Sequence, residues 1–281
     1  MLGFATSADS RAIEGGIPYE ARDLPVTIYE FISRARLMHG PRKALTFQLQ
    51  SGPKDRAETL TWDALHGRVT QAANLFRSLG VGESDVVAYL LPNCTETAVS
   101  LLAGAVAGIV NPINPLLDVE QIAAILRETK ARVLVTLKSF PHTDLAQKAA
   151  AALALAPDVK VLLEVDLNRY LDAPKRWIVP FLRPRTEAAH QARVMDFNAA
   201  CAYQPADHLT FTDSEVDRVA AYFHTGGTTG MPKVAQHKYS GMIYNGWIGG
   251  TIIFAPEDVL ICPLPLFHVL AAYPVFMSCI Y

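Results

Sequence analysis

The chain has 281 residues, of which 51% are hydrophobic and 19% are charged, so it holds enough apolar material for one large or two modest cores and too much for an intrinsically disordered chain. Its formal net charge of −2 lacks the basic surplus that is typical of nucleic-acid-binding proteins, and we expect no nucleic-acid partner. The 4 cysteines are far apart and form no Cys-x-x-Cys pair, which argues against a structural zinc site or a disulfide framework. The first residues lack the basic start and long apolar core of a secretory signal, and the most apolar stretch, Ala98–Val110, is too short to span a bilayer. We therefore expect a cytoplasmic protein.

Helical and strand patterns alternate along most of the chain. Thr61 stands where it can cap a helix, and Asp118 with Gln121 forms the pattern of a capping box. Further helices are predicted over Thr97–Ala107 and Ala146–Leu155, and the prolines among residues 111–115 predict a loop. Short apolar runs predict strands over Asp85–Leu91, Arg132–Leu137, Val159–Val165, Val219–Phe223 and Val259–Cys262. This alternation predicts an α/β fold with a largely parallel sheet.

Residues 166–217 are less regular and contain four prolines, as expected of an insertion. We expect residues 1–217 to form a first α/β subdomain that carries this insertion, and residues 218–281 to begin a second one. Within the insertion, Lys175–Arg185 combines four basic residues with Trp, Ile, Val, Phe and Leu, which fits either a surface insertion packed on the domain or a peripheral membrane contact. The sequence stops at Tyr281 inside an apolar run, so we expect it to be a portion of a longer protein.

Residues 224–233 concentrate the chemistry, with the sequence His-Thr-Gly-Gly-Thr-Thr-Gly-Met-Pro-Lys directly after a predicted strand. Three glycines leave backbone N–H groups uncovered, and three threonine hydroxyls with the Lys233 ammonium complete an anion cradle that suits a di- or triphosphate. A Walker P-loop has Gly before its lysine and Ser or Thr after it, whereas here Pro232 precedes Lys233 and Val234 follows it. The segment is therefore a phosphate-binding loop of another kind, or an ordinary Gly-rich turn between strands.

Position by position, Thr225–Lys233 resembles the phosphate-loop signature of the adenylate-forming superfamily, the acyl-CoA synthetases and their relatives. Further segments are similar to motifs of this family, in the family's order: Leu60–Leu65, Gly80–Val87, Leu91–Asn93, Ala107–Pro115 and Pro263–His268. The resemblance implies the N-terminal part of the family's large domain, with layered sheets flanked by helices.

The resemblance also implies a reaction in which a carboxylic acid attacks the α-phosphorus of ATP, pyrophosphate leaves, and a thiol, usually that of coenzyme A, takes the acyl group. Lys233 would add a positive charge beside the phosphates, Thr225 would touch Mg²⁺, and His268 would border the acyl carboxylate as the catalytic residue. Phe267 would be a pocket wall or a core aromatic. The β- and γ-phosphates would be cradled by Thr225, Gly226, Gly227, Thr228, Thr229 and Gly230.

The sequence departs from the family pattern after Lys233, where Val234 follows directly and the segment is one residue shorter, which leaves the role of His237 open. The family's adenine motif, its acidic magnesium ligand, and its C-terminal domain with the adenylation lysine and the coenzyme A contacts would all follow Tyr281. We therefore expect the 281-residue chain alone to be inactive as a ligase.

Two other functions remain open: an adenylation domain that loads an amino acid onto a carrier protein, and a nucleotide-binding module without catalysis. Residues 262–281 contain no aspartate that could bind a substrate amine, which favours fatty or aryl acids over amino acids.

Overall fold

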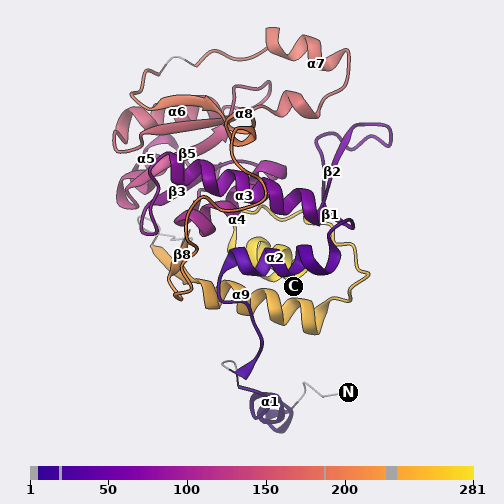
Figure 1. Ribbon diagram of the computed structural model, residues 1–281. Helices are drawn as coiled ribbons and strands as arrows, with labels where there is room; N and C mark the ends of the chain where they lie inside the picture. Colours follow the sequence, from indigo (N-terminus) through magenta and orange to yellow (C-terminus); the bar gives the residue numbers. More distant parts are fainter. Residues whose placement is uncertain (1–5, 19–20, 187, 226–232) are drawn as a thin grey trace.

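The computed structural model describes residues 6–18, 21–186, 188–225 and 233–281. Its centre is a 7-stranded sheet in the order β7-β6-β5-β3-β4-β8-β9 (Figure 1). All neighbouring strands run parallel except β8 and β9, which pair antiparallel. The sheet confirms the predicted α/β fold. Its strands are β3 (Val86–Leu90), β4 (Ile109–Pro112), β5 (Ala131–Leu137), β6 (Val161–Val165), β7 (Arg193–Asp196), β8 (Val219–His224) and β9 (Val234–Lys238).

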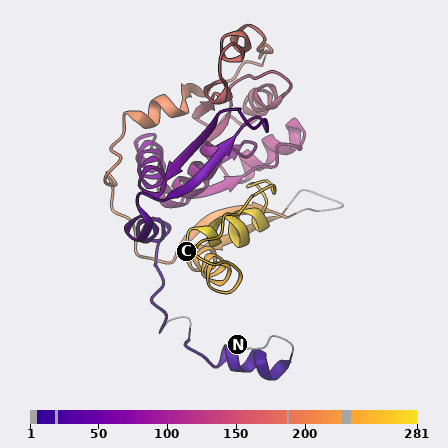
Figure 2. The same ribbon diagram turned by 90° about the vertical axis from the view of Figure 1, so that its right-hand side faces the viewer.

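Helices cover both faces of this sheet (Figure 2). α4 (Thr95–Ala107) connects β3 to β4 and packs against α3 (Trp62–Ser78), whereas α5 (Val119–Glu128) and α6 (Leu145–Leu155) pack against each other. The connections from β3 to β4 and from β4 to β5 run in opposite directions across the sheet, so right-handed crossovers place α4 and α5 on opposite faces. Every residue of α4 is buried, as expected of an apolar helix in the core.

The predicted helix caps are confirmed. The Thr61 side chain accepts a hydrogen bond from the Ala64 backbone N–H at the start of α3, and Asp118 with Gln121 forms the capping box of α5. Gly80 follows α3 with a φ of +84°, a left-handed conformation that favours glycine. A Cβ atom at this position would also lie 2.7 Å from the Arg132 guanidinium.

Two segments differ from their predicted structure. Asn111 and Pro112 belong to β4 rather than to a loop: they pair with Ala88 and Tyr89 of β3, and Pro112 removes only one backbone donor, at the end of the strand. Val259–Cys262 is not a strand: it pairs with no strand in the described part of the chain, and Val259 and Ile261 are 93% and 84% exposed. An apolar run becomes a strand only where another strand supplies hydrogen-bond partners.

The N-terminal elements were not predicted from the sequence. β1 and β2 form a separate antiparallel pair beside the main sheet. These elements are α1 (Ser7–Glu14), α2 (Ile28–His39), β1 (Lys43–Gln48) and β2 (Ala57–Thr61).

Residues 166–217 are partly regular. β7 adds an edge strand to the sheet and α8 (Phe197–Ala202) packs on α3, so this part of the insertion belongs to the fold. Three short helical turns precede it: η2 (Leu167–Tyr170), α7 (Lys175–Ile178) and η3 (Val179–Phe181). The division of the chain at residue 217 stays a prediction.

After β9 the chain forms helical elements separated by an irregular segment, residues 254–268. Elements after β9 are α9 (Tyr239–Ile248), η4 (Gly249–Ile253), η5 (Ala271–Phe276) and η6 (Met277–Cys279). Across the described residues, none of the helices has the length and apolar character needed to cross a membrane.

Candidate functional site

The Gly- and Thr-rich loop joins β8 to β9. The last pair of the two strands is His224 with Val234, and beyond it the Thr225 backbone N–H and hydroxyl both donate to the Lys233 carbonyl oxygen, at 2.9 and 3.3 Å. Thr225 and Lys233 therefore face each other at the base of the loop, and both are exposed. The other predicted phosphate-binding residues lie outside the described residues: Gly226, Gly227, Thr228, Thr229 and Gly230.

Strand β8 is fastened to the core by two polar side chains. The Arg218 guanidinium donates to the carbonyl oxygens of Ala105, Val106 and Gly108 at 2.7 to 2.9 Å. These carbonyls end helix α4, where a positive charge is favourable. The buried Asn111 amide donates to the Tyr222 carbonyl at 3.1 Å and ties β4 to β8. The base of the loop is thereby held in a fixed place at the end of the sheet.

His268 follows a segment, residues 263–267, that is bound to the end of β3. The Asn93 amide donates to the Leu264 carbonyl and its oxygen accepts from the Leu266 N–H, both at 2.8 Å. The Tyr89 hydroxyl donates to the Leu266 carbonyl at 2.7 Å. The next residue, Phe267, is half-buried and packs against the core, in agreement with a core aromatic.

The His268 ring is exposed, and its Nδ1 accepts a hydrogen bond from the Leu270 backbone N–H at 3.2 Å. In a neutral ring this contact leaves the proton on Nε2. Nε2 is therefore the atom that would donate to a ligand.

Both parts of the site lie at one edge of the sheet. β3, β4 and β8 are parallel neighbours, so their carboxyl ends meet at the same edge. Asn93 follows β3 and Thr225 follows β8, with β4 between them. In open α/β sheets, ligands bind outside the carboxyl ends of the strands. The structure thus brings the base of the loop and the segment before His268 to the edge where a ligand is expected.

Three rings connect the hairpin to the turn that follows His268. Phe223 and His237 from β8 and β9 each lie with ring centroids 5.2 Å from Tyr273 of η5, and 5.4 Å from each other. Burial lowers the pKa of His237 below its usual value, which keeps the ring uncharged near neutral pH. The structure therefore places the His237 ring in packing contact with Phe223 and Tyr273.

The charges around the base of the loop suit a phosphate. Lys233 forms no ion pair with any residue that the structure describes, so its ammonium can meet an anion. The described residues hold no cluster of three or more His, Cys, Asp or Glu side chains that could bind a metal by themselves.

A family model described as AMP-binding enzyme matches residues 34–281. The chain belongs to this family. Marinolic acid–CoA ligase from Pseudoalteromonas sp. (strain SANK 73390) is 30% identical over 253 residues, which cover 87% of this chain and 35% of that ligase. For 4-coumarate–CoA ligase 1 from Arabidopsis thaliana, the identity is 24% over 250 residues, covering 87% and 38% of the two chains.

The fold of this chain is similar to that of a CoA ligase of known structure. The crystal structure of an anthranilate CoA ligase in complex with anthranoyl-AMP matches it with a TM-score of 0.68 at 19% identity, over 91% of this chain and 45% of that one. The chain spans less than half the length of each of these relatives.

Proposed function

We propose that this chain is the ATP-binding, acid-activating part of an AMP-forming acyl-CoA synthetase. The observation that carries the proposal is the shared position of two groups at the carboxyl edge of the sheet: Thr225 and Lys233 at the base of the loop, and His268 after the segment bound by Asn93. Family membership supports this assignment.

Acid activation requires that the phosphate charge be screened and that the carboxylate be aligned for attack. Lys233 supplies a positive charge, and Thr225 supplies a hydroxyl that would serve phosphate or its Mg²⁺. ATP would supply the adenylyl group, with pyrophosphate as the leaving group, and coenzyme A would supply the thiol that takes the acyl group and releases AMP. His268 would donate from Nε2 to a carboxylate oxygen and orient the acid, while its Nδ1 is held by the Leu270 N–H. The glycine and threonine residues between Thr225 and Lys233 would add backbone and hydroxyl donors to the phosphates.

For the substrate we propose an aryl or fatty carboxylic acid. Two relatives carry names that refer to marinolic and 4-coumaric acids, and the structural neighbour holds anthranoyl-AMP. The lack of aspartate in residues 262–281 supports an acid without a charged amine.

The test is ATP–pyrophosphate exchange with a panel of aryl and fatty acids, in a protein where these 281 residues are followed by the remaining domains of the family. Lys233→Ala should lower exchange at limiting ATP by about tenfold or more, because a charge-assisted contact to phosphate is lost. Lys238→Ala is the matched control, since Lys238 ends the same hairpin and lies 3.8 Å from Asp217.

Equal exchange rates in the two lysine variants would exclude the proposed role of Lys233. Nucleotide binding without any exchange would identify a nucleotide-binding module instead of a ligase.

A further inference from the structure

The helical turn formed by α7 and η3 projects from one end of the molecule in both views (Figures 1 and 2). Four large apolar side chains of this turn are exposed, and we call them the apolar tip: Trp177 (69%), Ile178 (50%), Phe181 (89%) and Leu182 (60%). Single exposed apolar residues are common on protein surfaces, but a cluster on one projecting turn marks an interaction surface.

The backbone on either side of the apolar tip is held by specific polar contacts. After the tip, the Arg183 guanidinium donates to both carboxylate oxygens of Asp166, at 2.7 and 2.9 Å, and to the Ser139 carbonyl at 3.2 Å. Before the tip, the Asn168 amide donates to the Arg176 carbonyl at 3.0 Å. The turn is therefore fixed at both ends while its apolar side chains stay in solvent.

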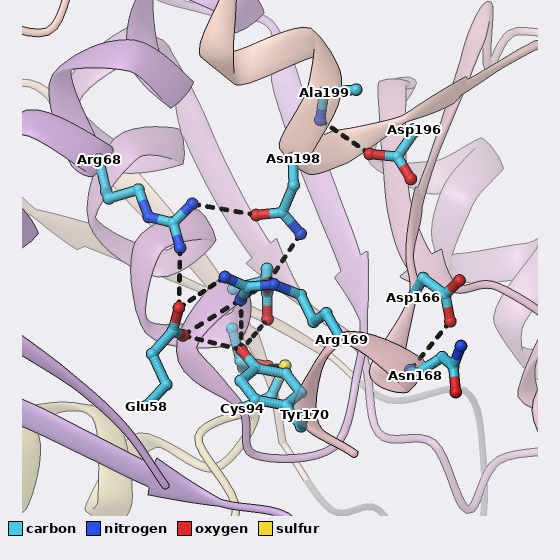
Figure 3. Close-up of polar contacts among 12 residues, drawn as sticks. Glu58, Arg68, Cys94, Asp166, Asn168, Arg169, Tyr170, Asp196, Asn198 and Ala199 are labelled. Carbon is cyan, nitrogen blue, oxygen red and sulfur yellow. Dashed lines mark hydrogen bonds and ion pairs between the residues drawn. The ribbon is translucent and has the colours of Figure 1, made fainter. Parts of the chain in front are cut away.

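A buried carboxylate joins the two ends of the insertion, and Figure 3 shows three residues that contact it, Arg169, Tyr170 and Asn198. Glu96 of α4 is 2% exposed and accepts hydrogen bonds from Arg169 at 2.6 Å, Tyr170 at 2.6 Å and Asn198 at 2.8 Å. Arg169 and Tyr170 precede the tip in the chain, and Asn198 follows it. Arg169 also pairs with Glu58, so the base of the insertion is locked to the core. Such anchoring presents the apolar tip in one defined place.

The positive charge around the apolar tip favours an anionic partner. Four basic residues and no acidic residue occur between Lys175 and Arg185, in a chain whose formal net charge is −2. The side chains of Arg176 and Arg185 are exposed and form no ion pair with a residue that the structure describes. A second copy of this chain docking through the same surface would set basic residues against basic residues, which is unfavourable. The basic residues around the apolar tip are therefore complementary to an anionic surface.

We propose that the apolar tip docks this protein on an anionic lipid bilayer. Trp177 and Phe181 would enter the interface between headgroups and acyl chains, where aromatic side chains are favoured, and Arg176 and Arg185 would contact lipid phosphates. The long basic side chains can lie along the apolar surface and keep their charges at headgroup level.

Vesicle co-sedimentation of the 281-residue chain tests the proposal, using phosphatidylcholine vesicles with and without phosphatidylglycerol. We expect binding only to the anionic vesicles, weaker at high salt, and a blue shift of the tryptophan fluorescence that the Trp177→Ser substitution removes. Trp177→Ser with Phe181→Ser should weaken binding by roughly tenfold or more, since the apolar contribution is lost. Arg176→Gln with Arg185→Gln should weaken it by about fivefold for each charge.

The matched control is Val259→Ser with Ile261→Ser, an equally exposed apolar pair elsewhere in the chain, which should bind as the parent does. All six positions are exposed, and thermal melts would verify that each variant folds. Absent binding to anionic vesicles, or unchanged binding of the Trp177→Ser/Phe181→Ser variant, would overturn the proposal. A further result would also overturn it: sedimentation velocity in which the parent is an oligomer and the Trp177→Ser/Phe181→Ser variant is a monomer, with unchanged vesicle binding. The apolar tip would then contact a second copy of the chain.

Discussion

His66, on α3, is a buried histidine whose surroundings favour the neutral ring. Its side chain is 3% exposed, its Nε2 lies 3.0 Å from the Ser33 hydroxyl, and its ring centroid lies 5.1 Å from that of Tyr29. Burial, followed by the positive charge of Arg36, lowers the pKa of His66 from 6.5 to about 4. Protonation of this ring would therefore oppose folding.

The first stability prediction follows from that pKa. Between pH 6.5 and pH 4 the unfolded chain binds a proton that the folded chain excludes, so the stabilisation is complete above pH 6.5 and is lost as the pH falls toward 4. At ~1.4 kcal/mol per pKa unit, the loss amounts to about 3 kcal/mol. Urea unfolding across this range should show a shallower pH slope in His66→Gln. His208→Gln, at a side chain that is 64% exposed, should keep the parent slope. A parent-like slope in His66→Gln would contradict the prediction.

The residues of the candidate site differ in how far the sequence could predict them. Thr225 and Lys233 belong to one short motif, so their spacing alone indicates phosphate chemistry. Asn93 and Tyr89, which bind the segment before His268, were not predicted as anchors, because their partners lie 171 to 177 residues away in the sequence. Each of the two is a polar or hydroxyl side chain at the end of a buried strand, and this local pattern does not indicate which distant residue it will contact.

At the scale of elements, the contact between η2, α4 and α8 depends on the Glu96 carboxylate. Glu96→Ala would leave Asn198 and part of the Arg169 guanidinium without their buried acceptor, and we expect the free energy of unfolding to fall by about 3 kcal/mol. The control is Arg36→Ala, which removes an exposed surface ion pair and should cost below about 1 kcal/mol. Chemical denaturation of both variants measures these two losses in the free energy of unfolding. Similar losses would show that the buried network contributes no more than a surface pair.

Elements with strong local signals were predicted, and elements that depend on distant partners were not. The start of α3 and the capping box of α5 are set by neighbouring residues, and both are confirmed. β9 has mostly polar residues, none of them buried, and it is a strand because it pairs antiparallel with β8. Val259–Cys262 shows the converse case: its apolar pattern favours a strand, but no strand of the described residues pairs with it.

At the scale of the whole molecule, the alternation of helices and strands was sufficient to predict the fold class. The strand order could not be predicted from the sequence. β8 pairs with β4, which lies more than a hundred residues earlier in the chain, and β7 lies within the irregular insertion. The family was indicated by motif order and is confirmed by the match over residues 34–281. Substrate and acceptor are not encoded in any motif of this chain, so they stay proposals.

The last prediction concerns catalysis by the chain as a unit. The 253 and 250 residues that match two CoA ligases cover 35% and 38% of those proteins. Closure of a further domain over the bound nucleotide is a common requirement for completing such a site. We therefore expect the purified chain to form no acyl-CoA from ATP, Mg²⁺, coenzyme A and a panel of aryl and fatty acids, while a complete CoA ligase in the same coupled assay does. Turnover clearly above the buffer blank, abolished by Lys233→Ala, would show that these residues suffice for the reaction.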